Sequence, residues 1–104
     1  MNYGIAYQIR AIKEYEEATE WYKERSIQAA ENFEDAVNKK IDILRVHPLR
    51  YRKTYKEFHE IRLDKYPFNI IFLVAEIKMI VVISSIYHHK RNPKKKFKEG
   101  TMGV

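Results

Sequence analysis

Apolar and polar residues alternate at the start of the chain, which is typical of a strand with one buried face. The apolar positions of this strand are Tyr3, Ile5, Tyr7 and Ile9. From Arg10 onward the spacing changes to three and four residues, which places apolar side chains on one face of a helix. This spacing predicts a first helix with a stripe formed by Ala11, Tyr15, Ala18 and Tyr22.

A second helix is predicted to begin after Ser26, because a serine oxygen can accept a hydrogen bond from the first helical turn. Its apolar stripe consists of Ala30, Phe33, Val37, Ile41 and Leu44. The helix should end near His47, because Pro48 disfavours helical geometry in the residue before it. The short joint at residues 23–26 makes the two helices an antiparallel hairpin.

After Pro48 the spacing returns to a period of two. One predicted strand directs its apolar and charged side chains to opposite faces. Ile61 and Leu63 lie on one face, and the other face carries Glu60, Arg62 and Asp64. The proline in segment 66–68 predicts a bend, because it cannot donate a hydrogen bond to a central ladder. The runs NIIFLVAE and KMIVVISSIY then predict two long, tightly joined strands at the centre of a sheet.

These elements predict one α+β domain at residues 1–97. Its N-terminal strand is followed by an antiparallel helical hairpin, which packs on one face of a largely antiparallel, twisted sheet of four to five strands. A chain of 104 residues is long enough for one such core. Residues 98–104 are predicted to form a flexible C-terminal tail.

The composition narrows the class of protein. Apolar residues make up 45% of the chain and charged residues 33%, which is typical of a soluble globular protein. No apolar run approaches the roughly 18 residues of a membrane span, and the N-terminus does not resemble a secretion signal. Cysteine is absent, which excludes disulfides and thiolate chemistry. A cytoplasmic protein without membrane contact is expected.

Charge is distributed unevenly along the chain. The net charge of +6 combines 7 Lys/Arg and 9 Asp/Glu in residues 1–45 with 13 Lys/Arg and 5 Asp/Glu in residues 46–104. A basic C-terminal half favours a polyanionic partner, either nucleic acid or an acidic protein segment. Solubility alone is the alternative explanation. The residues predicted to bind such a target are Arg52, Lys53, Lys56, Lys90, Lys94, Lys95 and Lys96.

The end of the last apolar strand, YHHKRNPKKK, carries the candidate chemistry. Metal-independent RNA cleavage needs a base, an acid and cations that balance charge on the phosphate. His88, Arg62, Arg91 and Tyr87 form the candidate site, on the concave face of the sheet. Because His88 and His89 are consecutive, they point to opposite faces of a strand. The alternative for His88 is a hydrogen bond to backbone near the strand end.

Metal and cofactor sites are not predicted. The two adjacent histidines diverge, and His47 and His59 lie far away along the chain. A zinc site needs four ligands, and no histidine or carboxylate spacing supplies them.

Five segments in this order resemble the RelE/ParE superfamily of bacterial toxins from type II toxin–antitoxin modules. They are the first strand, AIKEYEEATEWY, HPLRY, EIRLDKYPFNIIFLV and VVISSIYHHKRNPKK. The resemblance runs from Tyr3 to about Phe97. It implies a small toxin that a cognate antitoxin holds inactive. RelE-like members cut mRNA on the ribosome without metal, whereas ParE-like members poison DNA gyrase.

One position departs from the RelE pattern. RelE-like nucleases usually carry an arginine near the start of the penultimate strand, where this chain has Asn69. Arg62 matches a basic position of the family, and His88 matches its recurrent histidine. The ParE-like alternative, with gyrase as the target, is therefore favoured over an mRNA endonuclease. An inactive remnant that only binds its partner is the third alternative.

Trp21 and Tyr22 are adjacent on the first predicted helix, so only one of them points into the core. The stripe spacing assigns Tyr22 to the core. Trp21 is therefore the predicted contact residue, either for an antitoxin helix or for a second copy of the toxin in a homodimer.

Overall fold

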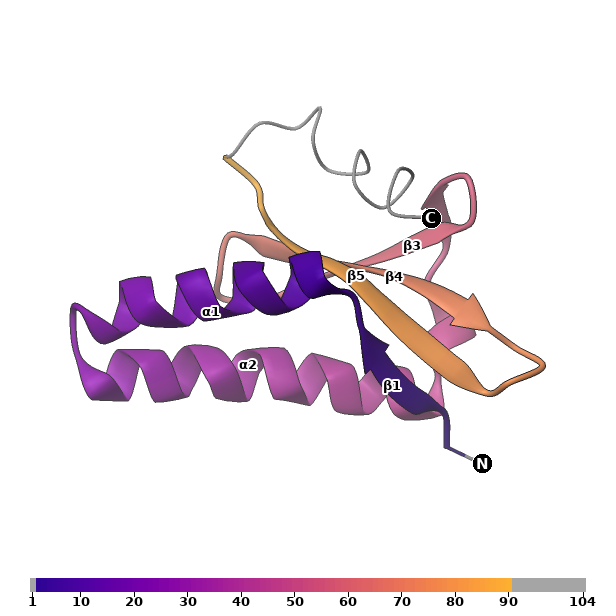
Figure 1. Ribbon diagram of the computed structural model, residues 1–104, viewed down its shortest axis with the longest axis horizontal. Helices are drawn as coiled ribbons and strands as arrows, with labels where there is room; N and C mark the ends of the chain where they lie inside the picture. The colour runs from indigo at the N-terminus through magenta and orange to yellow at the C-terminus, as the bar shows by residue number, and fades with distance from the viewer. Residues whose placement is uncertain (1, 91–104) are drawn as a thin grey trace.

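The computed structural model describes residues 2–90, which form a helical hairpin packed against one sheet (Figure 1). The two helices are α1 and α2, and a short 3₁₀ turn (η1) leads into the last four strands. In chain order the elements are β1 (Gly4–Tyr7), α1 (Ile9–Lys23), α2 (Ile27–Val46), η1 (Pro48–Arg50), β2 (Lys53–Tyr55), β3 (Phe58–Arg62), β4 (Phe68–Ala75) and β5 (Ile80–His88).

The sheet has five strands in the order β1-β5-β4-β3-β2. Its β5–β4, β4–β3 and β3–β2 pairs are antiparallel, and β1 runs parallel to β5. The helical hairpin carries the chain from β1 at one edge of the sheet to β2 at the other edge. The predicted α+β architecture is confirmed. No helix among the described residues is both long and apolar enough to cross a membrane.

The helix boundaries follow local chemistry. The backbone N–H of Ala29 donates a 2.9 Å hydrogen bond to Ser26 Oγ, as the capping prediction requires, and α2 ends against His47 before Pro48. The predicted placement of Ile9 in the first strand is wrong. Gln8 still donates its backbone N–H to the Ile83 carbonyl of the sheet, but it occupies the N-cap position of α1, so Ile9 is the first residue of the helix.

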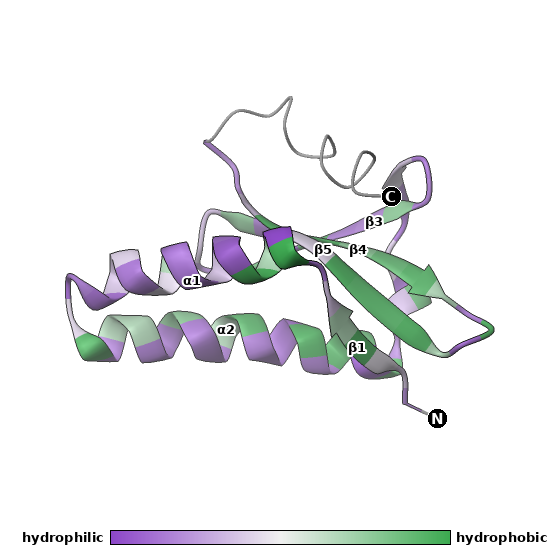
Figure 2. Cartoon of the chain, viewed as in Figure 1, coloured by the Kyte–Doolittle hydropathy of each residue, from purple (hydrophilic) through white to green (hydrophobic). Residues whose placement is uncertain are grey.

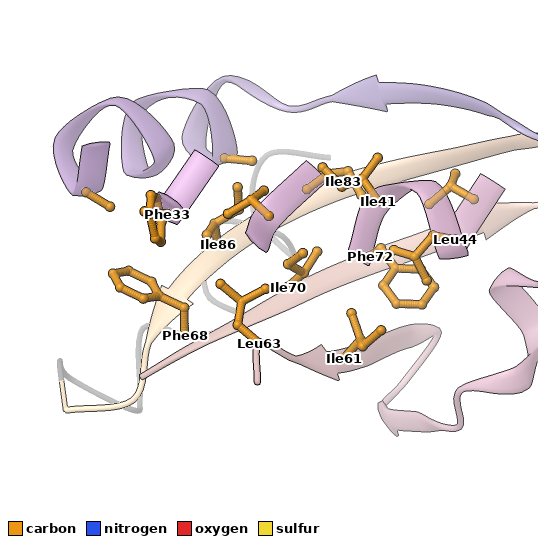
Figure 3. Close-up of a cluster of buried hydrophobic side chains, with 14 residues drawn as sticks. Phe33, Ile41, Leu44, Ile61, Leu63, Phe68, Ile70, Phe72, Ile83 and Ile86 are labelled. Atoms are coloured by element: carbon orange, nitrogen blue, oxygen red, sulfur yellow. The ribbon is translucent and has the colours of Figure 1, made fainter. Parts of the chain in front are cut away.

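The main core lies between the helices and the sheet (Figure 3). The predicted stripe of α2, from Ala30 to Leu44, is buried at all five positions. Apolar colour runs along β4 and β5 and in stripes along the helices (Figure 2). The core therefore follows the predicted periodicity closely.

A β-bulge interrupts the pairing of the two central strands. Phe72 pairs with Ile83 and Ile71 pairs with Ser85, so Ser84 is an extra residue without a partner position on β4. A bulge reverses the alternation of side chains beyond it. The last residues of β5 therefore face the opposite way from what the first half of the strand predicts.

Candidate functional site

The sheet face turned away from the helices, here called the open face, brings together polar and apolar side chains. Arg62, Asn69 and Tyr87 occupy one lateral row, because Arg62 pairs with Asn69 and Asn69 pairs with Tyr87. Next to this row is a small apolar cluster formed by Phe58, Ile71 and Tyr87, with Leu73 packed against it. Three strands thus supply the open face.

A chain of polar side chains crosses the open face. Asn69 donates from Nδ2 to Glu60 Oε2, and its Oδ1 lies 2.5 Å from His89 Nε2. Thr54 Oγ1 donates a 3.1 Å hydrogen bond to the other Glu60 oxygen. Because the Asn69 amide nitrogen faces Glu60, its oxygen faces His89, so the imidazole Nε2 is assigned as a donor. Asn69 is the centre of this chain.

His88 lies on the helix-covered face, so its predicted grouping with Arg62 and Tyr87 is wrong. Its ring packs edge-to-face against Phe68, with ring centroids 4.9 Å apart. Its Nδ1 accepts a 3.0 Å hydrogen bond from the Lys90 backbone N–H, which is the structural role left open by the sequence. The Ser84 bulge and strand alternation turn Tyr87 to the open face and His88 away from it.

Tyr87 is almost fully buried on the open face. Burial raises the pKa of its hydroxyl above the usual range, and the Arg10 guanidinium offsets only part of this effect. The hydroxyl therefore stays protonated at neutral pH.

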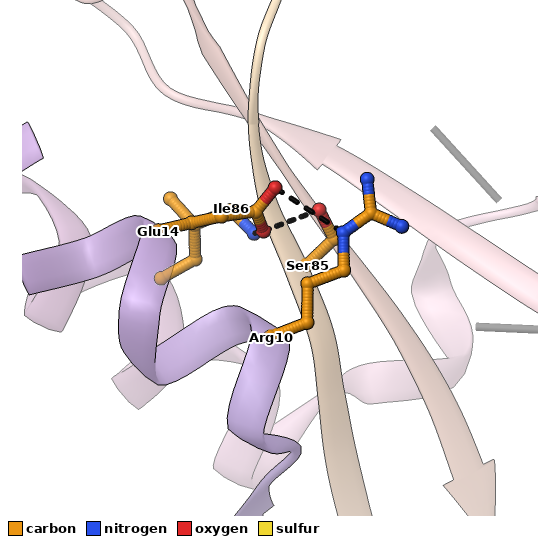
Figure 4. A network of polar contacts seen from close by, with 4 residues as sticks. All are labelled: Arg10, Glu14, Ser85 and Ile86. Carbon is orange, nitrogen blue, oxygen red and sulfur yellow. Dashed lines mark hydrogen bonds and ion pairs between the residues drawn. The ribbon is translucent and has the colours of Figure 1, made fainter. Parts of the chain in front are cut away.

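Arg10 and Glu14 form a polar cluster at the edge of β5 that the sequence interpretation missed (Figure 4). Glu14 Oε1 accepts hydrogen bonds from Ser85 Oγ at 2.7 Å and from the Ile86 backbone N–H at 3.0 Å. Arg10 Nε donates to the other oxygen at 3.3 Å. The carboxylate thus occupies the place beside β5 that β1 leaves after Tyr7. The available signal was the position of Glu14 within the apolar stripe of the first helix.

The predicted target-binding cations of the β2–β3 hairpin are exposed. Lys53 forms a 2.7 Å ion pair with Glu57, and this hydrogen bond lowers the pKa of the Glu57 carboxyl. Lys56 lies in the tight turn with a positive φ of 49°, and its ammonium is 5.3 Å from the Tyr55 ring centroid. Arg52 and Lys90 are also exposed. All four of these side chains are therefore accessible to solvent.

Several predicted residues lie outside the described part of the chain. They are Arg91, Lys94, Lys95, Lys96 and the predicted tail 98–104. Within residues 2–90, no group of three or more histidine, aspartate or glutamate side chains is arranged to hold a metal ion.

Trp21 is 46% exposed, whereas Tyr22 stacks on Phe33 with ring centroids 5.0 Å apart. The geometric part of the Trp21 prediction is therefore confirmed. The Arg25 guanidinium lies over the indole, 3.2 Å from the ring centroid, and its Nη1 donates a 2.8 Å hydrogen bond to the Trp21 carbonyl.

A family of known proteins and several solved structures match this chain. Residues 2–93 match the family described as the ParE toxin of the type II toxin–antitoxin system parDE. A chain from the chromosomal ParDE toxin–antitoxin system of P. aeruginosa is similar in structure, with a TM-score of 0.69, 13% identity, and coverage of 83% of this chain and 95% of that chain. No curated protein matches the sequence.

Two E. coli structures share the fold at comparable identity. A double arginine-to-alanine mutant of the RelE toxin in the free state has a TM-score of 0.66 and 16% identity, and the match covers 100% of this chain and 99% of that chain. A chain of the intact RelBE toxin–antitoxin complex has a TM-score of 0.52 and 16% identity, with 86% and 99% coverage.

Proposed function

Because the chain belongs to the ParE toxin family of type II toxin–antitoxin systems, we propose that it acts by binding a protein target of the DNA gyrase class through its open face. Gyrase is the target that the resemblance to ParE-like toxins implies. The observation that carries this proposal is the position of Asn69 at the centre of the open face, between Arg62 and Tyr87.

Asn69 replaces the arginine that RelE-like nucleases carry near the start of this strand. An arginine there would balance the negative charge that develops on phosphate during RNA cleavage. Asn69 is neutral, and it is hydrogen-bonded to the Glu60 carboxylate. A carboxylate beside this position repels phosphate oxygens. The central row of the open face is therefore better suited to a protein surface than to RNA cleavage.

The composition of the open face supports the same proposal. Protein interfaces combine an apolar centre with polar side chains around it, and tyrosine and arginine are enriched among their strongest contacts. The exposed Arg62 and the half-buried Asn69 lie directly beside the apolar cluster, whose Ile71 and Tyr87 are buried. The cluster thus supports the strands from below, and Arg62 supplies an accessible orienting charge.

A cognate antitoxin is the second partner, in keeping with the RelBE complex among the similar structures. Residues 47–90 carry 8 Lys/Arg and 4 Asp/Glu, so this region is basic. An acidic, amphipathic antitoxin segment complements that charge.

A gyrase supercoiling assay tests the proposed target. The wild-type toxin should inhibit supercoiling, and Arg62→Ala should raise the required concentration about tenfold or more, as expected for a contact residue at the centre of an interface. Lys39→Ala is the matched control, because Lys39 is an exposed cation on α2. Gyrase that is unaffected by a large excess of folded toxin would rule out this target.

An mRNA endonuclease is the second candidate, favoured by one observation. His89, which lies 2.5 Å from Asn69 on the open face, is a titratable group on the same face as Arg62 and Tyr87. Primer extension on translated mRNA should compare His89→Gln with its neighbour His88→Gln. New cleavage ends that only His89→Gln abolishes would support the nuclease, and a wild type that produces none would exclude it. Induction without growth arrest would support an inactive remnant.

A further inference from the structure

The outer surface of the helical hairpin, here called the hairpin face, is the side of α1 and α2 that points away from the sheet (Figure 1). It carries a groove of about 290 Å³ between the two helices. Buried Ile86 lies at the floor of this groove, and exposed Glu16 and Asn38 lie at its mouth. Tyr7 and Ile12 also line the groove and are each 43% exposed. The hairpin face therefore has an apolar centre that is open to solvent.

Charge divides the hairpin into two halves. In the half next to β1, residues 9–15 and 37–46 carry 5 Lys/Arg and 2 Asp/Glu. In the half next to the joint between the helices, residues 16–36 carry 2 Lys/Arg and 7 Asp/Glu. Because α1 and α2 are antiparallel, the boundary between the two charges crosses both helices at one level, and the groove lies at that level. One end of the hairpin is thus basic, and the other end is acidic.

This distribution of charge decides which kind of partner fits the hairpin face. A uniformly acidic partner, whether nucleic acid or an acidic protein segment, is repelled by residues 16–36, and a uniformly basic partner is repelled by the other half. A second copy of the chain that is turned end for end meets both halves with the opposite charge. Every favourable contact then forms twice, because a two-fold contact repeats each pair of residues. The groove lies at the charge boundary, so the two grooves meet at the centre of such a contact.

We infer that two copies of the toxin associate through the hairpin face, with their α2 helices antiparallel and groove against groove. Asp35 and Lys39 are exposed and lie one helical turn apart on α2, on either side of Val37. A two-fold axis at the level of Val37 places Asp35 of each copy beside Lys39 of the other copy. The contact thus has an apolar centre with polar pairs around it, as protein interfaces do. The open face lies on the opposite side of the sheet in each copy, so the inference does not depend on the gyrase target.

Sedimentation of the full-length toxin between about 1 and 100 μM tests this association. The wild type should form dimers, which added salt should weaken. Asp35→Lys and Lys39→Asp should each raise the dissociation constant about tenfold or more, because each brings like charges together twice. The double variant exchanges the two charges and should return the constant to within about threefold of wild type. Glu76→Lys makes the same charge reversal at an exposed residue of the turn between β4 and β5, and it should change the constant less than about threefold.

Thermal unfolding of each variant establishes that it is folded, as expected for substitutions at exposed positions. A wild type that sediments as a monomer at about 100 μM would overturn the inference, and so would single variants that associate as tightly as wild type. A double variant that associates no better than the single variants would also overturn it, because Asp35 and Lys39 would then not face each other. If Asp35→Lys weakened antitoxin binding but left the association of toxin copies unchanged, the hairpin face would belong to the antitoxin and the inference would fail. None of these outcomes depends on the gyrase assay.

Discussion

The two faces of the central strands differ in what their side chains do. On the helix-covered face, Phe72 and Ile83 are completely buried in one continuous apolar core. On the open face, the apolar cluster is small and adjoins a polar chain that runs from Glu60 through Asn69 to His89. The first face is specified by packing, whereas the second combines packing with hydrogen bonding. Substitutions should therefore affect mainly stability on one face and mainly binding on the other.

The largest effect is expected on the helix-covered face. Phe72→Ala removes a fully buried ring that stacks on His59, and it should lower the free energy of unfolding by about 3–5 kcal/mol. Leu73→Ala, its neighbour on the open face, is only partly buried and should cost about 1–2 kcal/mol. Urea unfolding measures both values. Equal losses would contradict the contrast between the faces.

A smaller effect is expected where α1 meets the β5 edge. Glu14→Leu leaves the Ile86 N–H and the Ser85 hydroxyl without their acceptor and should destabilise the protein by about 1–3 kcal/mol. Glu20→Leu, at an exposed position of α1, should change stability by no more than about 0.5 kcal/mol. If the two variants unfold at the same urea concentration, Glu14 does not stabilise the strand edge.

The two serines of β5 provide a closer comparison. Ser85→Ala removes a donor to Glu14 and should cost about 1 kcal/mol. Ser84 is buried, and its hydroxyl has no hydrogen-bond partner among the described residues. Ser84→Ala should therefore be neutral or stabilising by up to about 1 kcal/mol. A midpoint of thermal unfolding that falls as far for Ser84→Ala as for Ser85→Ala would refute this distinction.

The smallest effect at neutral pH is expected for Tyr87→Phe. Burial raises the pKa of Tyr87 in the folded state, so its contribution is fully present below about pH 10 and is lost as pH rises through the folded pKa. The variant should differ from wild type by no more than about 1 kcal/mol at pH 7 and should lose less stability above pH 10. Thermal unfolding between pH 7 and pH 11 tests this, and parallel curves would disprove it.

Most of the fold was predictable because its signals are local. The stripe from Ala30 to Leu44 and the cap at Ser26 depend on residues within one or two helical turns, and the structure confirms both. The candidate site was less predictable. Side chains alternate between the two faces of a strand, so one residue assigned to the wrong face misplaces every residue that follows it. An extra residue at Ser84 reverses every later position, which the sequence does not mark with glycine or proline. The cluster of Arg10 and Glu14 depends on contacts across more than 70 residues, which spacing cannot reveal.

The bulge also has a consequence for how such a protein changes over generations. Ser84 is the extra residue of the bulge, so loss of its codon would join Ile83 directly to Ser85 and restore regular pairing with Ile71 and Phe72. Tyr87 would stay on the open face and His88 on the helix-covered face. The bulge thus lets this strand lose one residue in a related gene without exchanging its tyrosine surface for a histidine surface.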